Sequence, residues 1–365
     1  MTKERTTGRQ HQADWPITRD EIVGLVATAS RAPSLHNSQP WWFRASGNLL
    51  ELHVDSSRNL PQTDPDGREM LISCGAALYG LRLGMRKLGY LPRVELLPDP
   101  SQPGLIARVQ PGGRAPITRH ERDLLEAMPH RHTHRGPFAP VGVPGRLVAG
   151  LCRDASAEGA ALVLIDRPDQ VAQLVRLIAE AIGAQRASPE IRAELQRWTR
   201  PKGSPARDGV PAHAWAEGVP ADVPAGARDP SAAADEPRIA GPRAWTARRL
   251  EAPGHARLPQ RDFGLPGSLP RGGPLPSATA VLTTSGDAPA DWLRAGQALH
   301  RMLLNATTRW VFARLQTQPL ESLAGRAELR AHLDLDGMPQ MLMQFGRANI
   351  APATARRPAD EILRR

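Results

Sequence analysis

A loop framed by two prolines constrains this chain more than any other feature. Residues 31–43 read RAPSLHNSQPWWF. Proline fixes its own φ and disfavours helix in the residue before it, so Pro33 and Pro40 must end a preceding helix near Ser30 and produce a rigid loop. Side chains that both donate and accept hydrogen bonds follow along it, ahead of three aromatic residues: Ser34, Asn37, Ser38 and Gln39. This composition suits a flat heteroaromatic ring with polar edges; the alternative is a helix-ending loop whose side chains satisfy their own backbone.

Capping residues and hydrophobic periodicity predict helices and strands in mixed order. Thr18 and Glu21 form a capping box that opens a helix, and Thr118 and Glu121 form a second one. Together with these capping boxes, hydrophobic periodicity predicts helices over residues 18–29, 72–88, 118–128, 145–154, 168–185, 189–198 and 287–314. It predicts strands over residues 50–54, 93–97, 105–109, 160–165, 278–284 and 341–345. Because these elements do not alternate in a βαβ rhythm, the expected fold class is α+β.

Composition divides the chain into two structured units separated by an irregular segment. Residues 1–14 are polar and predicted to be a disordered tail, and residues 15–117 form a first unit. Residues 118–199 and 276–365 form a second unit, interrupted by a Pro/Gly/Ala-rich segment over 200–275 that is a linker, a functional cover or a disordered stretch. The sequences GAALYGLRL from Gly75 and GQALHRMLL from Gly296 share residues at identical offsets, which hints that the two units are related.

Charge and cysteine content exclude several classes of protein. The 47 Lys and Arg residues outnumber 37 Asp and Glu, for a formal net charge of +10, but they are scattered rather than grouped, so no nucleic-acid partner is expected. Two cysteines, Cys74 and Cys152, exclude a disulfide framework and most structural zinc sites. The N-terminal residues contain no apolar run, and no stretch is long enough to cross a bilayer, so we expect a soluble, cytoplasmic protein without a membrane partner.

A second candidate site follows Pro129. Arg131, Thr133 and Arg135 alternate, so an extended backbone would place two guanidinium groups and a hydroxyl on one side. Arginine pairs bidentately with phosphate oxygens, which makes this segment a candidate phosphate-binding element. Two alternatives remain: a solvated basic loop, and a metal site on the intervening histidines. The metal is disfavoured because no carboxylate or cysteine ligand lies nearby in sequence, so we expect none.

These motifs together resemble a known family. The order Ala-Pro-Ser-Leu-His-Asn-Ser-Gln-Pro-Trp over residues 32–41 resembles the A-P-S-x-x-N-x-Q-P-W signature of the FMN-dependent nitroreductase superfamily, and with Ile-Ser-Cys-Gly-Ala-Ala-Leu over 72–78 it looks most like the Acg branch. Residues 131–138 resemble the R-[RH]-[ST]-x-[RK]-x-[FY] motif with which nitroreductases hold the FMN phosphate. The resemblance implies a nitroreductase-like fold.

The order of these motifs carries a further implication. In typical members the arginine motif precedes the A-P-S loop, and each FMN lies at a dimer interface between the two motifs of different subunits. Here the loop comes first, so the chain resembles two fused subunits with one complete FMN site, and we expect a monomer. By the resemblance, the following residues would contact FMN: Pro33, Ser34, Asn37, Gln39, Arg131, Thr133, Arg135, Arg356 and Arg357.

The implied activity is NAD(P)H-dependent two-electron reduction of a small-molecule acceptor such as a nitroaromatic compound or a quinone. FMN itself carries the hydride chemistry, so no catalytic side chain is required. The alternative is a flavin-sequestering, stress-related protein with little turnover, in which residues 200–275 cover the flavin. Arg309-Trp310-Val311 stands where typical reductases have Gly-Leu-Gly, a departure from the reductase pattern that favours this alternative. A hydrolase with Ser34 or Cys74 as nucleophile is disfavoured, because the chain has no G-x-S-x-G motif.

Overall fold

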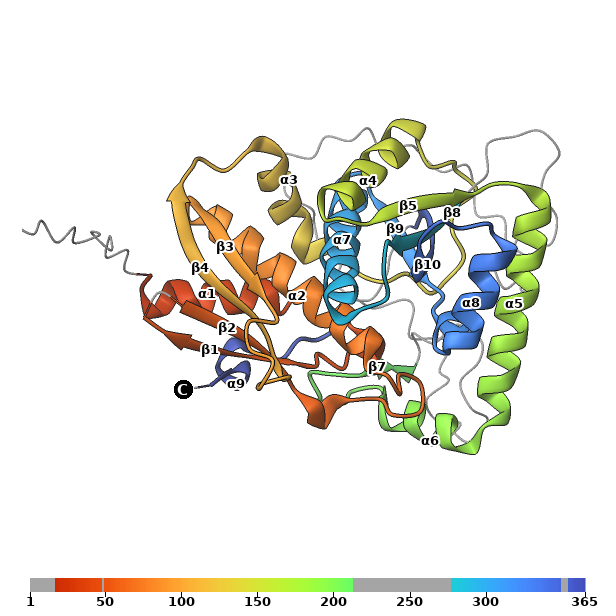
Figure 1. Ribbon diagram of the computed structural model, residues 1–365, viewed down its shortest axis with the longest axis horizontal. Helices are drawn as coiled ribbons and strands as arrows, with labels where there is room; N and C mark the ends of the chain where they lie inside the picture. Colours follow the sequence, from red (N-terminus) through yellow and green to blue (C-terminus); the bar gives the residue numbers. More distant parts are fainter. Residues whose placement is uncertain (1–16, 48, 213–276, 349–353, 365) are drawn as a thin grey trace, which may run out of the picture.

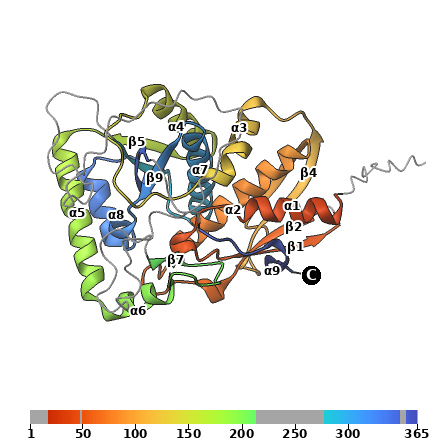
Figure 2. The same ribbon diagram turned by 180° about the vertical axis from the view of Figure 1, so that it is seen from behind.

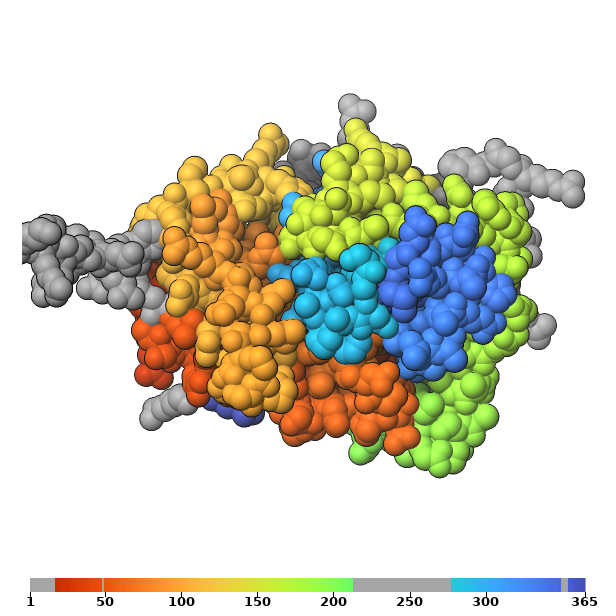
Figure 3. Space-filling view, viewed as in Figure 1, coloured from red at the N-terminus to blue at the C-terminus, as the bar shows by residue number. Residues whose placement is uncertain are grey.

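The computed structural model describes residues 17–47, 49–212, 277–348 and 354–364. These residues form two lobes, each built on a mainly antiparallel sheet, with the long helices α2 (Arg68–Lys87) and α7 (Pro289–Thr307) packed against each other between them (Figure 1). The surfaces of the two lobes adjoin in the space-filling view (Figure 3). The mixture of helices and sheets confirms the α+β class. Among the described helices, none is both long and apolar enough to cross a membrane.

The first lobe contains the proline-framed loop. Helix α1 (Arg19–Ala29) leads into it and begins at the predicted capping box, in which the Glu21 amide donates to the Thr18 hydroxyl at 3.2 Å and the Thr18 amide donates to the Glu21 carboxylate at 2.8 Å. The sheet has the order β11-β1-β2-β4-β3, with strands β1 (Trp41–Ser46), β2 (Leu49–Val54), β3 (Tyr90–Leu96), β4 (Leu105–Arg114) and β11 (Leu363–Arg364).

The second lobe contains the arginine segment and begins at the second predicted capping box, which is also formed. Its sheet has the order β5-β8-β10-β9. The helices are α3 (Arg119–Ala127), α4 (Gly145–Ala157), α5 (Pro168–Ala187), α6 (Pro189–Arg197) and α8 (Leu323–His332). The strands of the sheet are β5 (Ala161–Ile165), β8 (Ser277–Thr284), β9 (Val311–Leu315) and β10 (Met338–Arg347), while β6 (Thr199–Arg200) and β7 (Val210–Pro211) pair with each other.

The two lobes repeat one topology. Strands β1, β2, β3 and β4 correspond in order and in antiparallel pairing to β5, β8, β9 and β10, and a long helix lies between the second and third strand of each set. Strand β1 ends at Ser46 and β2 begins at Leu49, whereas residues 166–276 separate β5 from β8. The described part of that insertion comprises α5, α6, β6 and β7, so the predicted cover over 200–275 lies mostly outside the described residues.

The C-terminal segment crosses back to the first lobe (Figure 2). After the short helix α9 (Ala359–Ile362), β11 pairs in parallel with β1, placing Leu363 opposite Phe43. Ile362 is fully buried in the hydrophobic core of the first lobe. The segment that carries Arg356 and Arg357 is thereby held beside the proline-framed loop.

The predicted elements need correction at three places. The helix expected over residues 287–314 ends at Thr307, because Trp310 adopts a left-handed φ of 55° and the aromatic and β-branched run after it forms β9. Strand β1 was not predicted within the aromatic end of the loop, although Trp41 and Phe43 alternate toward the core. Helix α8 was also not predicted. Because tertiary packing decides such short elements, local periodicity is a weak guide to them.

Candidate functional site

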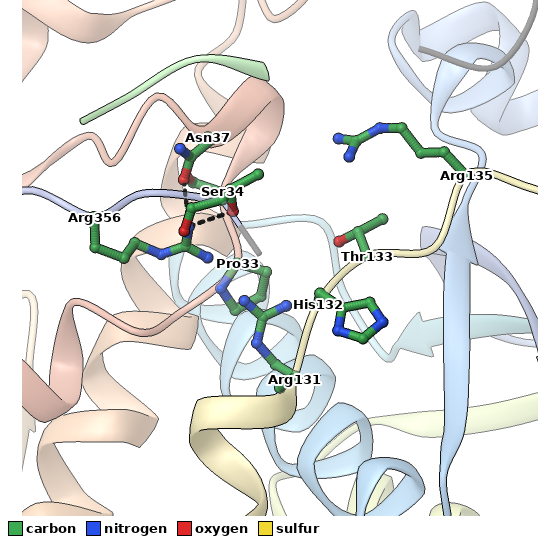
Figure 4. Close-up of a pocket in the computed structure, with 9 residues that line it drawn as sticks. Pro33, Ser34, Asn37, Arg131, His132, Thr133, Arg135 and Arg356 are labelled. Atoms are coloured by element: carbon green, nitrogen blue, oxygen red, sulfur yellow. Dashed lines mark hydrogen bonds between the residues drawn. The ribbon is translucent and has the colours of Figure 1, made fainter. Parts of the chain in front are cut away.

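One pocket brings the two candidate motifs together. Its empty space measures about 330 Å³, a volume that includes the solvent at its open side. Its lining comes from both lobes and from the C-terminal segment: Pro33, Ser34, Asn37, Arg131, His132, Thr133, Arg135, Thr354 and Arg356. Arg131, Thr133 and Arg135 point from one wall toward the loop residues and Arg356 on the other wall (Figure 4). Seven of the nine predicted site residues therefore meet in one place.

The arginine segment is held against the edge strand of the second sheet. Thr133 forms a parallel bridge with Ala313 of β9, and the His134 amide donates to the Ala313 carbonyl oxygen at 2.9 Å. The His132 ring stacks on Phe312 with 4.1 Å between ring centroids. This extended backbone is the reason that residues 131, 133 and 135 share one side, as the alternation predicted.

The lining of the pocket concentrates positive charge. Its lining includes three guanidinium groups and no carboxylate. Burial, together with the nearby Arg31, lowers the pKa of Arg131 to about 10, and burial lowers the pKa of Arg135 to about 10. Burial and then Arg131 lower the pKa of Arg356 well below its ordinary value. Arg131 and Arg135 stay charged near neutral pH, and an anion in the pocket would stabilise these buried charges.

Several buried nitrogen atoms at the pocket have no hydrogen-bond partner among the described residues. Among the described residues, the Nε atoms of Arg131 and Arg356 and Nε2 of His132 are buried without a hydrogen-bond partner. Burial, followed by the Arg131 charge, lowers the pKa of His132 to about 4, so its ring is neutral at pH 7. Since buried polar groups are normally satisfied, these nitrogen atoms fit a group rich in acceptor oxygens.

The proline-framed loop has an uncommon backbone. His36, Asn37 and Gln39 all adopt left-handed φ values, of 48°, 55° and 50°. The amide of Asn37 then joins three segments: its Nδ2 donates to the carbonyl oxygens of Gly209 at 3.0 Å and Ala355 at 3.1 Å, and its Oδ1 accepts from Arg356 Nη1 at 2.8 Å. Asn37 thus orients one of the pocket arginines (Figure 4).

The remaining two predicted residues, Gln39 and Arg357, lie behind the pocket rather than in its lining. Gln39 is fully buried, and its Oε1 accepts a hydrogen bond from the Arg357 backbone at 2.8 Å. The Arg357 side chain lies 3.6 Å from the Asp55 carboxylate. Both residues attach the C-terminal segment to the loop. His132 and Thr354 were not predicted from the sequence as pocket residues. The only indication in the sequence is position: His132 lies between Arg131 and Arg135, and Thr354 lies just before Arg356.

The structure also shows the surroundings of the residues in the metal-site and hydrolase hypotheses. Among the residues that the structure describes, no group of three His, Cys, Asp or Glu side chains is arranged to hold a metal ion. His134 instead packs against Phe138, with 4.8 Å between ring centroids. Cys74 is fully buried, its Sγ lies 3.4 Å from the Pro40 carbonyl oxygen, and burial raises the pKa of its thiol, so it is poorly suited to act as a nucleophile.

Comparison with known proteins defines the class and then the family. No family model matches the chain. Curated relatives do: the chain is 32% identical to the putative NAD(P)H nitroreductase Rv3131 of Mycobacterium tuberculosis over 94% of this chain and 91% of the relative. It is 30% identical to the putative NAD(P)H nitroreductase acg of the same organism, over 96% and 97% of the two chains. The class is therefore nitroreductase-like. Within it, the chain belongs to the family of Acg-like putative NAD(P)H nitroreductases.

Proposed function

We propose that this protein binds FMN in the pocket and uses it for NAD(P)H-dependent reduction of a small-molecule acceptor, such as a nitroaromatic compound or a quinone. The observation that carries the proposal is the convergence of Arg131, Arg135 and Arg356 in a lining without a carboxylate. A phosphate dianion would neutralise this charge and occupy the unpartnered guanidinium nitrogens.

The residues divide into two groups by role. Arg131, Thr133, Arg135 and Arg356 would hold the phosphate, while Pro33, Ser34 and Asn37 would face the ring and the ribityl chain. Gln39 and Arg357 would support this arrangement from behind, through the hydrogen bond between them. Bound FMN would supply the hydride chemistry, accepting electrons from NAD(P)H and passing them to the acceptor. The chain's own contribution is to bind, orient and control access.

The repeated topology supports the interpretation that the chain corresponds to two fused subunits. In that arrangement the first lobe supplies the loop and the second lobe supplies the arginine segment, so that a monomer carries the complete site. The return of β11 to the sheet of the first lobe is consistent with this exchange of segments between halves.

A visible spectrum of the purified protein, followed by anaerobic addition of NADPH and then NADH, tests the proposal. A reductase should be yellow, with flavin bands that bleach within seconds of adding a nicotinamide. A yellow protein that dithionite bleaches but nicotinamides do not would contradict the reductase activity and favour sequestration. A colourless protein that cannot be loaded with FMN would contradict the binding site.

A further inference from the structure

A short segment of the insertion grips the proline-framed loop through its backbone. We call residues 207–209 the insert clamp. The Gly209 amide donates to the Asn37 carbonyl oxygen at 3.3 Å, and Gly209 accepts from Asn37 Nδ2 at 3.0 Å. Gln39 Nε2 donates to the Arg207 carbonyl oxygen at 2.8 Å. The repeated topology has no counterpart of this segment in the first lobe, where β1 ends at Ser46 and β2 begins at Leu49.

An ion pair fixes the clamp in place. The Asp208 carboxylate accepts from Arg58 Nη1 at 2.9 Å and from Arg200 Nη2 at 2.7 Å. The same Nη1 atom of Arg58 donates to the Ser38 carbonyl oxygen at 2.7 Å, so Arg58 connects the clamp directly to the loop. The two guanidinium groups lie over the Trp198 ring, 5.9 and 5.8 Å from its centroid.

Gly209 is required at its position for two reasons. Its φ of +73° is unfavourable for other residues, and a Cβ there would lie 2.7 Å from the Trp198 carbonyl oxygen. Glycine at this position therefore lets the clamp backbone take this conformation beside Trp198.

The loop needs such external support. Left-handed conformations are unfavourable for most non-glycine residues and persist where the surroundings over-determine them. The loop has such conformations at His36, Asn37 and Gln39, and the clamp contacts the last two directly. Because Asn37 also accepts a hydrogen bond from Arg356, the support extends to one of the pocket arginines.

We propose that the insert clamp, locked by the Asp208–Arg58 pair, is a positioning element that holds the loop and Arg356 in the geometry that binds FMN. This role rests on the proposed function. Arg58 and Asp208 are absent from the pocket lining, so they would act through Ser38, Asn37 and Gln39 rather than by touching the cofactor.

The test compares Asp208→Asn, Arg58→Gln and the double variant by FMN titration, thermal unfolding without FMN, and visible-region circular dichroism of FMN-saturated protein. Each single variant should weaken FMN binding about tenfold, as expected for a lost hydrogen bond to a charged group. The FMN dissociation constant of the double variant should be smaller than the product of the two single effects predicts, because both substitutions remove the shared Asp208–Arg58 pair. The flavin dichroism should change, since the loop next to the ring shifts. Asp169→Asn, which breaks an exposed ion pair with Arg167, is the matched control and should change neither affinity nor dichroism.

Each contrary result has a distinct meaning. Unchanged FMN affinity and dichroism in both single variants would overturn the positioning role, and a lowered melting temperature alongside them would show that the pair is merely structural. Wild-type protein that takes up no FMN would overturn the proposed function and the clamp's role with it. If the wild type binds FMN and the single variants show the same affinity and dichroism, only the positioning role of the clamp would be overturned, and the proposed function would stand.

Discussion

Gly75 on α2 and Gly296 on α7 meet the opposite helix in the same way. A Cβ on Gly75 would lie 2.9 Å from the Leu293 carbonyl carbon, and a Cβ on Gly296 would lie 2.8 Å from the Ala76 amide nitrogen and would also collide with the Ile72 carbonyl. Leu293 lies three residues before Gly296, and Ile72 lies three residues before Gly75. The helices thus cross reciprocally, as two related copies would across a twofold axis, which gives the sequence similarity at these glycines a structural reason.

Replacing either glycine should destabilise the protein. Gly75→Ala or Gly296→Ala would force the helices apart, and overpacking of this kind costs about 1–3 kcal/mol. Gly24→Ala is the matched control, because a Cβ on this exposed glycine of α1 meets nothing within 4 Å, and it should be neutral or stabilising by about 0.5–1 kcal/mol. Urea unfolding checks these values; equal stability of all three variants would show that the helices do not approach so closely.

Replacing a pocket arginine should affect binding and stability in opposite directions. Arg131→Met should weaken FMN binding by at least about tenfold, because a charge-assisted hydrogen bond contributes about 1.5–3 kcal/mol. The FMN-free variant should unfold at higher urea concentration than the wild type, because a buried charge that is repelled by Arg31 and Arg356 is removed. Arg176→Met, at an exposed ion pair, should change neither property appreciably. Lower stability of the FMN-free variant would mean that Arg131 is not an uncompensated charge.

Stability should depend on pH through the buried Glu69. Burial raises the pKa of Glu69 to about 7, despite the adjacent Arg68 guanidinium. Because the folded-state pKa lies above the unfolded value, the folded state binds this proton more tightly, and the associated stability is lost as pH rises from about 4.5 through 7. Glu69→Gln should therefore lose less stability than the wild type between pH 5 and 8.

The measurement is urea unfolding of both proteins at several pH values. Glu180→Gln, at an exposed position on α5, serves as the control and should follow the wild-type profile. Parallel profiles for the wild type and Glu69→Gln would contradict the raised pKa.

A fused pair of subunits should be monomeric and hold one flavin per chain. Light scattering should give the mass of one 39.6 kDa chain, and titration should saturate at one FMN, because the arginine segment and the A-P-S loop each occur once. A dimer that needs both copies to bind FMN, or two flavins per chain, would refute this interpretation.

Much of the site could be predicted because its signals are local. The two prolines define the loop, and alternation of Arg131, Thr133 and Arg135 places them on one side of an extended backbone. The left-handed residues of the loop could not be predicted, since local sequence holds no information about distant contacts such as that between Asn37 and Gly209, 172 residues apart. The role of Gln39 could not be predicted either, because its side-chain amide forms hydrogen bonds with the distant backbone of Arg207 and Arg357 instead of lining the pocket.

The fold shows the same division between local and distant causes. Both capping boxes form as the sequence predicts, because Thr and Glu satisfy one another within a single turn. The end of α7 depends instead on Trp310, whose ring packs near His130 of the arginine segment, 5.6 Å between centroids. A helical period that continues past Thr307 contains no information about that contact.

The central claim is that the three arginines bind the phosphate of FMN. Its most direct test is to titrate the FMN-free protein with FMN and with riboflavin, which has the same ring and ribityl chain without the phosphate. Charge-assisted contacts of about 1.5–3 kcal/mol each predict that FMN binds at least about a hundredfold more tightly, and that this advantage falls in Arg131→Met. Equal affinity for FMN and riboflavin would contradict the claim.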